Sequence, residues 1–175
     1  MKTPLTILMS LLLTLPAGSV LAMTSNPDGE VLGLIQAIDS NEIKAAQEAK
    51  DKNLDRKVAD YAKMMEKEHS KNLDRDEKLA QKTNIQPVET AQVQNLRTQG
   101  ADELSRLSPL QGAQFATAYI AAMVKDHSDA LALIDAQKDS VQNKDLKKHV
   151  TATRDHVAKH LDEAKKIQDQ LAKPQ

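Results

Sequence analysis

Two segments of this chain repeat one arrangement of residues that could bind a metal ion. The segment from Tyr61 to Lys71 reads YAKMMEKEHSK, and the segment from Tyr119 to Asp129 reads YIAAMVKDHSD. Each holds a tyrosine, a methionine four residues later, and an acidic residue followed directly by histidine and serine. Imidazole with carboxylate suits zinc, copper or iron, and a nearby thioether would favour copper. The repeat could therefore mark a metal site, or it could be an old duplication with ordinary packing.

The helical period places four polar side chains on apolar helix faces. At 100° per residue, Glu42 lies at the centre of the apolar stripe of one helix and His69 lies near the centre of the next. His127 lies toward the edge of its stripe, and His160 is the most inward histidine of the last helix. A carboxylate inside an apolar stripe is costly unless it is paired or ligated. The candidate metal ligands are therefore Glu42, His69, His127 and His160.

Two further residues are secondary candidates, Glu66 and His156. Glu66 precedes His69 by three residues, the spacing that places a carboxylate and an imidazole on neighbouring turns. Bundles that bind two metal ions use such a pair on two helices and a glutamate on each of the other two. Only one helix of this chain has the pair, so the two-metal set is incomplete. His149 is expected at the surface, and so is His156 unless it is a ligand.

A second interpretation needs no metal ion. Inward histidines can satisfy one another or a carboxylate in a buried polar network, and methionine at these positions can simply fill the core. Tyr61 and Tyr119 could bond carboxylates inside the protein, or could pack at a stripe edge with the hydroxyl outward. The sequence has no nucleophile elbow, no phosphate-binding glycine loop and no HExxH. It therefore predicts no enzyme.

The apolar pattern predicts an all-α protein with four long helices. They run from Val31 to about residue 49, from 54 to 82, from 109 to 140 and from about 146 to 171. Breaks near Asn53 and Asn143 make two antiparallel hairpins, which together predict an antiparallel four-helix bundle. Residues 83–108 form a crossover or a short extra helix. Ser108 and Pro109 are predicted to begin the third long helix, as its cap and first residue.

The first 22 residues are predicted to be a signal peptide, because a cation, an apolar run and a Val-Leu-Ala ending follow in order. Residues 23–30 are a polar, flexible leader, and residues 31–172 are the bundle domain. No second apolar run follows, so the mature chain has no predicted transmembrane segment. With 24 Lys and Arg against 25 Asp and Glu, mixed along the chain, no nucleic-acid surface is predicted. Cysteine is absent, which excludes disulfides and thiolate ligands.

Four segments together resemble a known family. They are SNEIKAAQEAK, YAKMMEKEHSKNLDRDEKLA, FATAYIAAMVKDHSDALALID and HLDEAKKI, which follow the predicted signal peptide. Over roughly residues 28–170 the chain resembles domain of unknown function 4142, an exported bacterial family in the ferritin-like grouping whose members are often labelled outer membrane proteins. The resemblance implies a ferritin-like four-helix bundle in the periplasm, with family positions at Glu42, His69, His127 and His160. The outer-membrane label has no support in the sequence, because the chain shows neither the alternating pattern of membrane β-strands nor a cysteine for a lipid anchor.

The sequence is compatible with three hypotheses for function. The first is an exported protein that binds a copper, zinc or iron ion inside the bundle, with a role in metal homeostasis or envelope stress. The second is a non-catalytic structural or interaction module with an envelope partner, whose histidines form a buried polar network. The third is a chaperone or adaptor, which a long exposed apolar stripe on residues 90–107 would favour. The sequence does not fix the oligomeric state.

Overall fold

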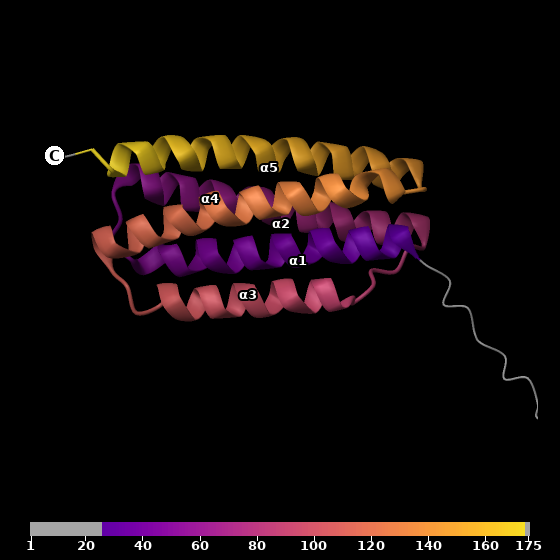
Figure 1. The fold of residues 1–175 in the computed structure, drawn as a ribbon, viewed down its shortest axis with the longest axis horizontal. Coiled ribbons are helices and arrows are strands. Elements are labelled where there is room, and N and C mark those ends of the chain that lie inside the picture. Colours follow the sequence, from indigo (N-terminus) through magenta and orange to yellow (C-terminus); the bar gives the residue numbers. More distant parts are fainter. Residues whose placement is uncertain (1–25, 174–175) are drawn as a thin grey trace, which may run out of the picture.

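The computed structural model describes residues 26–173, and there it is built from five long helices without any strand (Figure 1). The all-α prediction is confirmed for this part of the chain. The predicted signal peptide lies outside the described residues. The long helices are α1 (Pro27–Glu48), α2 (Arg56–Thr83), α3 (Ala91–Leu107), α4 (Gly112–Gln137) and α5 (Lys144–Leu171), and two short 3₁₀ helices are η1 (Ala49–Asp51) and η2 (Lys138–Ser140). None of them is long and apolar enough to cross a membrane.

Four of the helices surround a common core. The hairpin α1–α2 packs against the hairpin α4–α5, with α2 beside α5 and α1 beside α4. At one end the backbone N–H groups of Gln142 and Asn143 donate to Asp28, and at the other Gly112 N–H donates to the carbonyl of Lys52. Helix α3 lies along α1 at the edge of the molecule (Figure 1). It carries the chain back along the length of α1, so the segment that was predicted as a crossover or an extra helix forms a helix that also connects α2 to α4.

Two helix starts differ from the prediction. Helix α1 begins at Pro27 rather than Val31, because the Asn26 side chain caps it by accepting from Gly29 N–H, so the last part of the predicted leader is helical. Helix α4 begins at Gly112, and the predicted start at Ser108 and Pro109 is wrong. The Ser108 N–H donates to the carbonyl of Leu104, so this serine ends α3 instead of capping α4.

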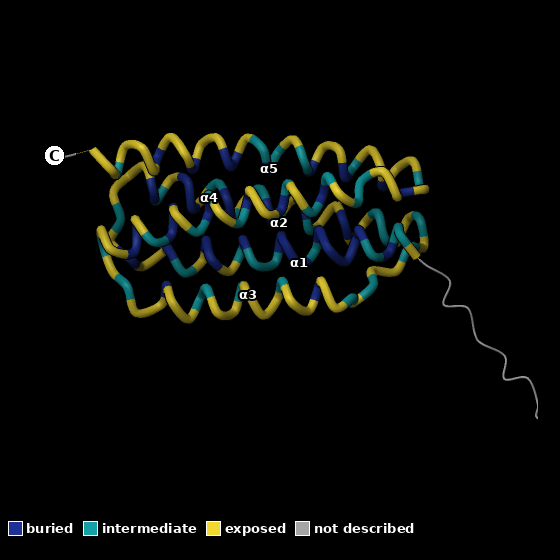
Figure 2. Tube along the Cα trace, in the orientation of Figure 1, coloured by how far each residue is buried: buried dark blue, intermediate teal, exposed yellow. Residues whose placement is uncertain are grey.

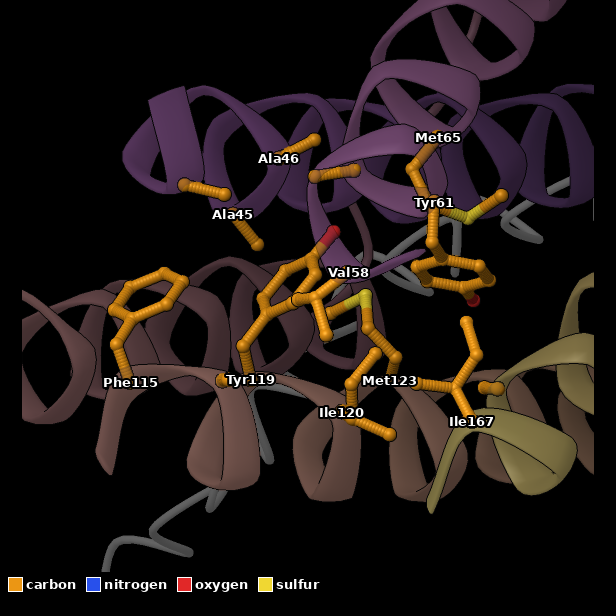
Figure 3. Packing of buried hydrophobic residues seen from close by; sticks show 14 of the residues in the cluster. Ala45, Ala46, Val58, Tyr61, Met65, Phe115, Tyr119, Ile120, Met123 and Ile167 are labelled. Carbon is orange, nitrogen blue, oxygen red and sulfur yellow. The ribbon is translucent and has the colours of Figure 1, made fainter. Parts of the chain in front are cut away.

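The interior has an apolar cluster at each end and a polar layer between them. One cluster gathers where α1 ends and α4 begins, and Figure 3 shows its largest side chains. The other gathers where α1 begins and α4 ends. Most buried polar residues of the four core helices fall between these clusters, namely Asp39, Glu42, His69, Asn72, Asp76, His127 and His160. Thr153 instead lies between Val150 and Val157 of the second cluster. The candidate residues thus lie between the two apolar clusters, away from the ends of the four helices.

The apolar residues of α3 face the rest of the protein. Val93 and Leu107 are buried, and the partly buried Leu96 and Leu104 pack against the two clusters. Most other α3 residues are exposed (Figure 2). The described part of the chain therefore shows no long exposed apolar stripe on residues 91–107, the feature that would favour a chaperone groove.

Lys52 is a buried lysine that joins the two hairpins at one end. Its Nζ donates to the Ser108 carbonyl at 2.7 Å and lies 2.8 Å from the Glu48 carboxylate. We expect Lys52→Met to lower the free energy of unfolding by about 2 kcal/mol, because a hydrogen bond to a charged group contributes ~1.5–3 kcal/mol. Chemical denaturation measures the change. The matched control is Lys50→Met, since the exposed Lys50–Glu66 pair should contribute below ~1 kcal/mol. Equal losses of stability in the two variants would contradict the role of burial.

Candidate metal centre

Three histidines from three helices meet in the polar layer. The ring centroid of His69 on α2 lies 5.7 Å from that of His127 on α4 and 5.1 Å from that of His160 on α5, and the last two are 5.5 Å apart. One ring nitrogen of each lies within 4.8 Å of one from each of the others. There is therefore a point between the rings that lies within ~2.8 Å of all three nitrogens. A metal–imidazole bond is ~2.1 Å long, so this distance is only slightly too large. Small movements of the rings would close this gap around an ion.

Each ring is held from outside through one of its nitrogens. His69 Nδ1 lies 2.7 Å from Asp39 Oδ1, His127 Nδ1 lies 2.9 Å from the Met123 carbonyl, and His160 Nε2 lies 2.8 Å from Glu68 Oε2. Carboxylates and carbonyls accept hydrogen bonds, so in the neutral ring the nitrogen facing each partner carries the hydrogen. The lone pair then lies on the other nitrogen. Outer partners of this kind fix the tautomer and orientation of metal-binding histidines.

The other nitrogen of each ring is buried without any partner. These nitrogens are Nε2 of His69, Nε2 of His127 and Nδ1 of His160. Buried polar atoms are normally hydrogen-bonded, and an unsatisfied one costs roughly 1–3 kcal/mol. Three unsatisfied lone pairs in one layer are therefore unusual for a purely structural network. A single metal ion would accept all three.

Burial also keeps two of these imidazoles in the form that binds metals. Desolvation lowers the pKa of His127 well below its usual range, and the neighbouring His69 and His160 lower it further. Desolvation lowers the pKa of His160 as well, against the opposing effect of its hydrogen bond to Glu68. Neutral imidazole is the ligand form, since a protonated ring has no lone pair to give.

Glu42 is buried, as the helical period predicts, and adjoins His127 without belonging to the group of three. Its Oε1 lies 3.6 Å from His127 Nδ1, and its Oε2 is buried without a partner. Burial raises the pKa of Glu42 well above its usual range, and the carboxylates of Asp126, Glu103 and Asp39 raise it further. Glu42 lies on the side of His127 that already bonds Met123.

Asp39 is the residue that the sequence interpretation missed. It is 1% exposed and accepts from His69, and its other oxygen accepts from Asn72 Nδ2 at 2.8 Å. The Asn72 side chain in turn accepts from Thr153 on α5 at 3.1 Å. Asp39 stands three residues before Glu42, on the same face of α1, and this spacing is the signal that could have found it.

The secondary candidates do not join the three histidines. The Glu66 carboxylate lies instead 2.7 Å from Lys50 Nζ and 3.2 Å from Gln47 Nε2, at the edge of the α1–α2 seam. Glu68, two residues later, is the glutamate that reaches His160. His156 is half-buried and lies outside the group of three.

The surface position expected for His149 is wrong. Its side chain is 12% exposed, and its Nε2 lies 2.5 Å from Asp76 Oδ1 on α2. Asp76 is fully buried, and this burial raises the pKa of its carboxyl to about 7. The pair is a further, partly buried polar contact between the hairpins.

The two tyrosines of the repeated motif lie in the neighbouring apolar cluster with Met65 and Met123 (Figure 3). Neither hydroxyl points outward: Tyr61 donates to the backbone carbonyl of His160 at 3.2 Å, and the buried Tyr119 hydroxyl has no partner. Burial raises the pKa of both phenols, so both stay protonated. The partner of Tyr61 is a backbone carbonyl rather than a carboxylate.

Comparison with known proteins gives one result. The sequence profile described as domain of unknown function (DUF4142) matches residues 14–167. No curated protein matches the chain, and no solved structure matches it. The matched range contains α1 to α4 and most of α5, including all three buried histidines. The chain therefore belongs to the DUF4142 family.

Proposed function

We propose that this protein binds one transition-metal ion through His69, His127 and His160. The observation that carries the proposal is the set of three buried, unpartnered imidazole nitrogens on rings whose other nitrogens are held by outer partners. Acceptors that hold the outer nitrogen in this way are typical of metal-binding histidines. Zinc, copper and iron all accept imidazole nitrogen, and three imidazoles leave one position open in a tetrahedral site. Glu42, whose Oε1 lies 3.6 Å from His127 Nδ1, is the candidate for a further oxygen ligand.

We also propose that the site lies in a ferritin-like bundle of an exported protein. Four antiparallel helices with one long connection, here occupied by α3, match the connectivity of ferritin-like folds. The signal-like residues 1–22 favour a periplasmic or secreted location after cleavage near Ala22. The role that fits these features is non-enzymatic, in metal homeostasis or envelope stress.

Calorimetric titration of the untagged mature protein with Zn²⁺, Cu²⁺ and, without oxygen, Fe²⁺ tests the metal proposal. We expect one ion per chain and a Kd tighter than ~10 μM, which corresponds to about −7 kcal/mol. At a free ion concentration of about 100 times Kd, the folded state should gain about 2.7 kcal/mol. Only weaker binding, or binding that survives loss of all three histidines, would defeat the proposal. The variant His149→Ala, which removes a histidine outside the group, should bind as the wild type does.

The alternative is a structural or interaction module of the envelope. It is favoured by the continuous polar chain from His69 through Asp39 and Asn72 to Thr153, and by the buried Asp76–His149 contact. Such a network can hold helices together without any ligand. In that case, removing a histidine lowers stability and changes no metal affinity.

A further inference from the structure

We propose that a cavity between α1, α3 and α4 is the route by which a hydrated divalent cation reaches the buried histidines. This inference rests on the metal-binding function proposed above. The cavity has a volume of about 240 Å³ and is lined by residues of all three helices, including Glu42 at its inner end. An ion with six waters needs roughly 180 Å³, at about 30 Å³ for each water. The cavity is therefore large enough for a cation that still holds its hydration shell.

The lining of this cavity is acidic. Its carboxylates outnumber its cations by five to two, namely Glu42, Asp102, Glu103, Asp126 and Asp129 against Arg106 and Lys125. Both cations are already engaged: Lys125 lies 2.7 Å from Asp129, and Arg106 lies 3.5 Å from Glu103. A cleft of one sign raises the local concentration of oppositely charged ions and speeds their association.

The carboxylates form a graded series from solvent to the histidines. The exposed fraction of the side chain falls from 59% at Asp129 to 34% at Asp126, 13% at Glu103 and 5% at Glu42. The last member is 3.6 Å from His127. A cation that enters at Asp129 thus meets a carboxylate at each depth as far as Glu42, which adjoins His127, although none of the three rings itself lines the cavity.

The inner carboxylates have free acceptor atoms. Glu42 Oε2 and Glu103 Oε1 are both buried without a hydrogen-bond partner, and Glu42 is itself 4% exposed. A hydrated cation offers water hydrogens to such oxygens and can then exchange its waters for them. These two atoms indicate a positively charged ligand independently of the acidic composition.

Helix α3 forms the outer wall of the route. Asn41 Nδ2 on α1 donates to the Leu96 carbonyl at 2.8 Å, and a Cβ on Gly100 would lie 2.4 Å from the Asn41 side chain. The helix is therefore seated closely against α1 at the cavity. This gives the crossover helix a role beyond connecting the hairpins: its Glu103 supplies part of the acidic series.

A second cavity lies on the opposite side of the histidines and is less suited to cations. It is larger, about 660 Å³, and runs between α2 and α5 past Glu68 to His160. Its lining includes the three lysines Lys57, Lys159 and Lys166 against four carboxylates. At its inner end, Glu68 already accepts from His160. Both features favour the α1–α3–α4 cavity as the route for a cation.

Stopped-flow mixing of the metal-free mature protein with Cu²⁺, read by quenching of tyrosine fluorescence, tests the route. We expect Glu103→Gln and the double variant Glu103→Gln/Asp126→Asn to slow association, the double variant by about 10-fold, because loss of electrostatic steering lowers on-rates by ~10-fold or more. The dissociation rate should fall by the same factor, since the ion leaves by the same route. The equilibrium Kd should therefore stay within about twofold of the wild-type value. The matched control, Asp162→Asn/Glu163→Gln in the second cavity, should leave both rates unchanged.

The outcomes separate this inference from the function on which it rests. Absence of Cu²⁺ binding by the wild type defeats the proposed function and the route with it. Wild-type binding with unchanged on-rates in both α3-side variants overturns the route alone. Slower association in the α2–α5 control assigns the route to the other cavity. A weaker Kd at an unchanged on-rate would mean that these carboxylates are ligands rather than a route, and would also overturn the inference.

Discussion

The variant His127→Leu is expected to lose tight metal binding while its metal-free form stays as stable as the wild type. Its affinity should fall by at least ~100-fold, more than the ~10–100-fold typical for loss of an outer partner. The metal-free protein loses the hydrogen bond to the Met123 carbonyl, but it also loses the unsatisfied Nε2. A buried acceptor without a partner destabilises the folded state by roughly 1–3 kcal/mol, so its removal can compensate for the loss of one neutral hydrogen bond, which contributes about 1 kcal/mol. Titration calorimetry and denaturation without metal measure the two quantities.

The same variant distinguishes the metal site from the polar network. His156→Leu is the matched control, because His156 is half-buried on α5 yet lies outside the group of three. It should retain the wild-type metal affinity. If His127→Leu instead lowers the free energy of unfolding by several kcal/mol and leaves metal binding as it was, the imidazole is part of a structural network and the metal proposal is wrong.

Asp39→Asn should weaken metal binding by ~10–100-fold although all three histidines remain, as expected for loss of an outer partner. The Asp39 carboxylate accepts from both His69 and Asn72. An asparagine amide has one acceptor oxygen and one donor group, so it can no longer accept from both through separate oxygens. If its N–H₂ faces His69 Nδ1, the ring must carry its hydrogen on Nε2, and the lone pair needed for the ion is lost.

Titration calorimetry and the ¹⁵N chemical shifts of His69 measure the affinity and the tautomer of this variant. Glu68→Gln is the matched comparison at His160. The Glu68 side chain is 43% exposed, so water can replace it, and the loss should stay below ~10-fold. A larger loss for Glu68→Gln than for Asp39→Asn would contradict the argument that burial of the outer partner decides its importance.

Periodicity within one helix predicts which side chains point inward, and it does so well here. His69 and Glu42 are buried as their positions in the apolar stripes indicate. Asp39 was missed because its contact with His69 depends on the position of α1 along the axis of α2. The helical period shows which face of a helix a residue occupies, but it does not show this relative position. His149 was misplaced for a related reason, since its partner Asp76 belongs to the other hairpin.

Local capping signals failed where tertiary contacts compete with them. Ser108 followed by Pro109 is a strong local start signal, yet the ammonium of Lys52 binds the Ser108 carbonyl and the Lys52 carbonyl accepts from Gly112. These contacts end α3 at Ser108 and begin α4 at Gly112. The sequence separation between the partners, 56 residues for Lys52 and Ser108, explains why no local pattern could show the boundary.

The division of the three histidines between the hairpins has a consequence for folding. Contacts inside each hairpin join residues near in sequence and should form early, whereas His160 and Glu68 are 92 residues apart. His69 belongs to the first hairpin, and His127 and His160 to the second. The group is therefore complete only after the hairpins dock. A bound ion stabilises that docked state alone, so it should slow amide hydrogen exchange most where separation of the hairpins exposes the backbone.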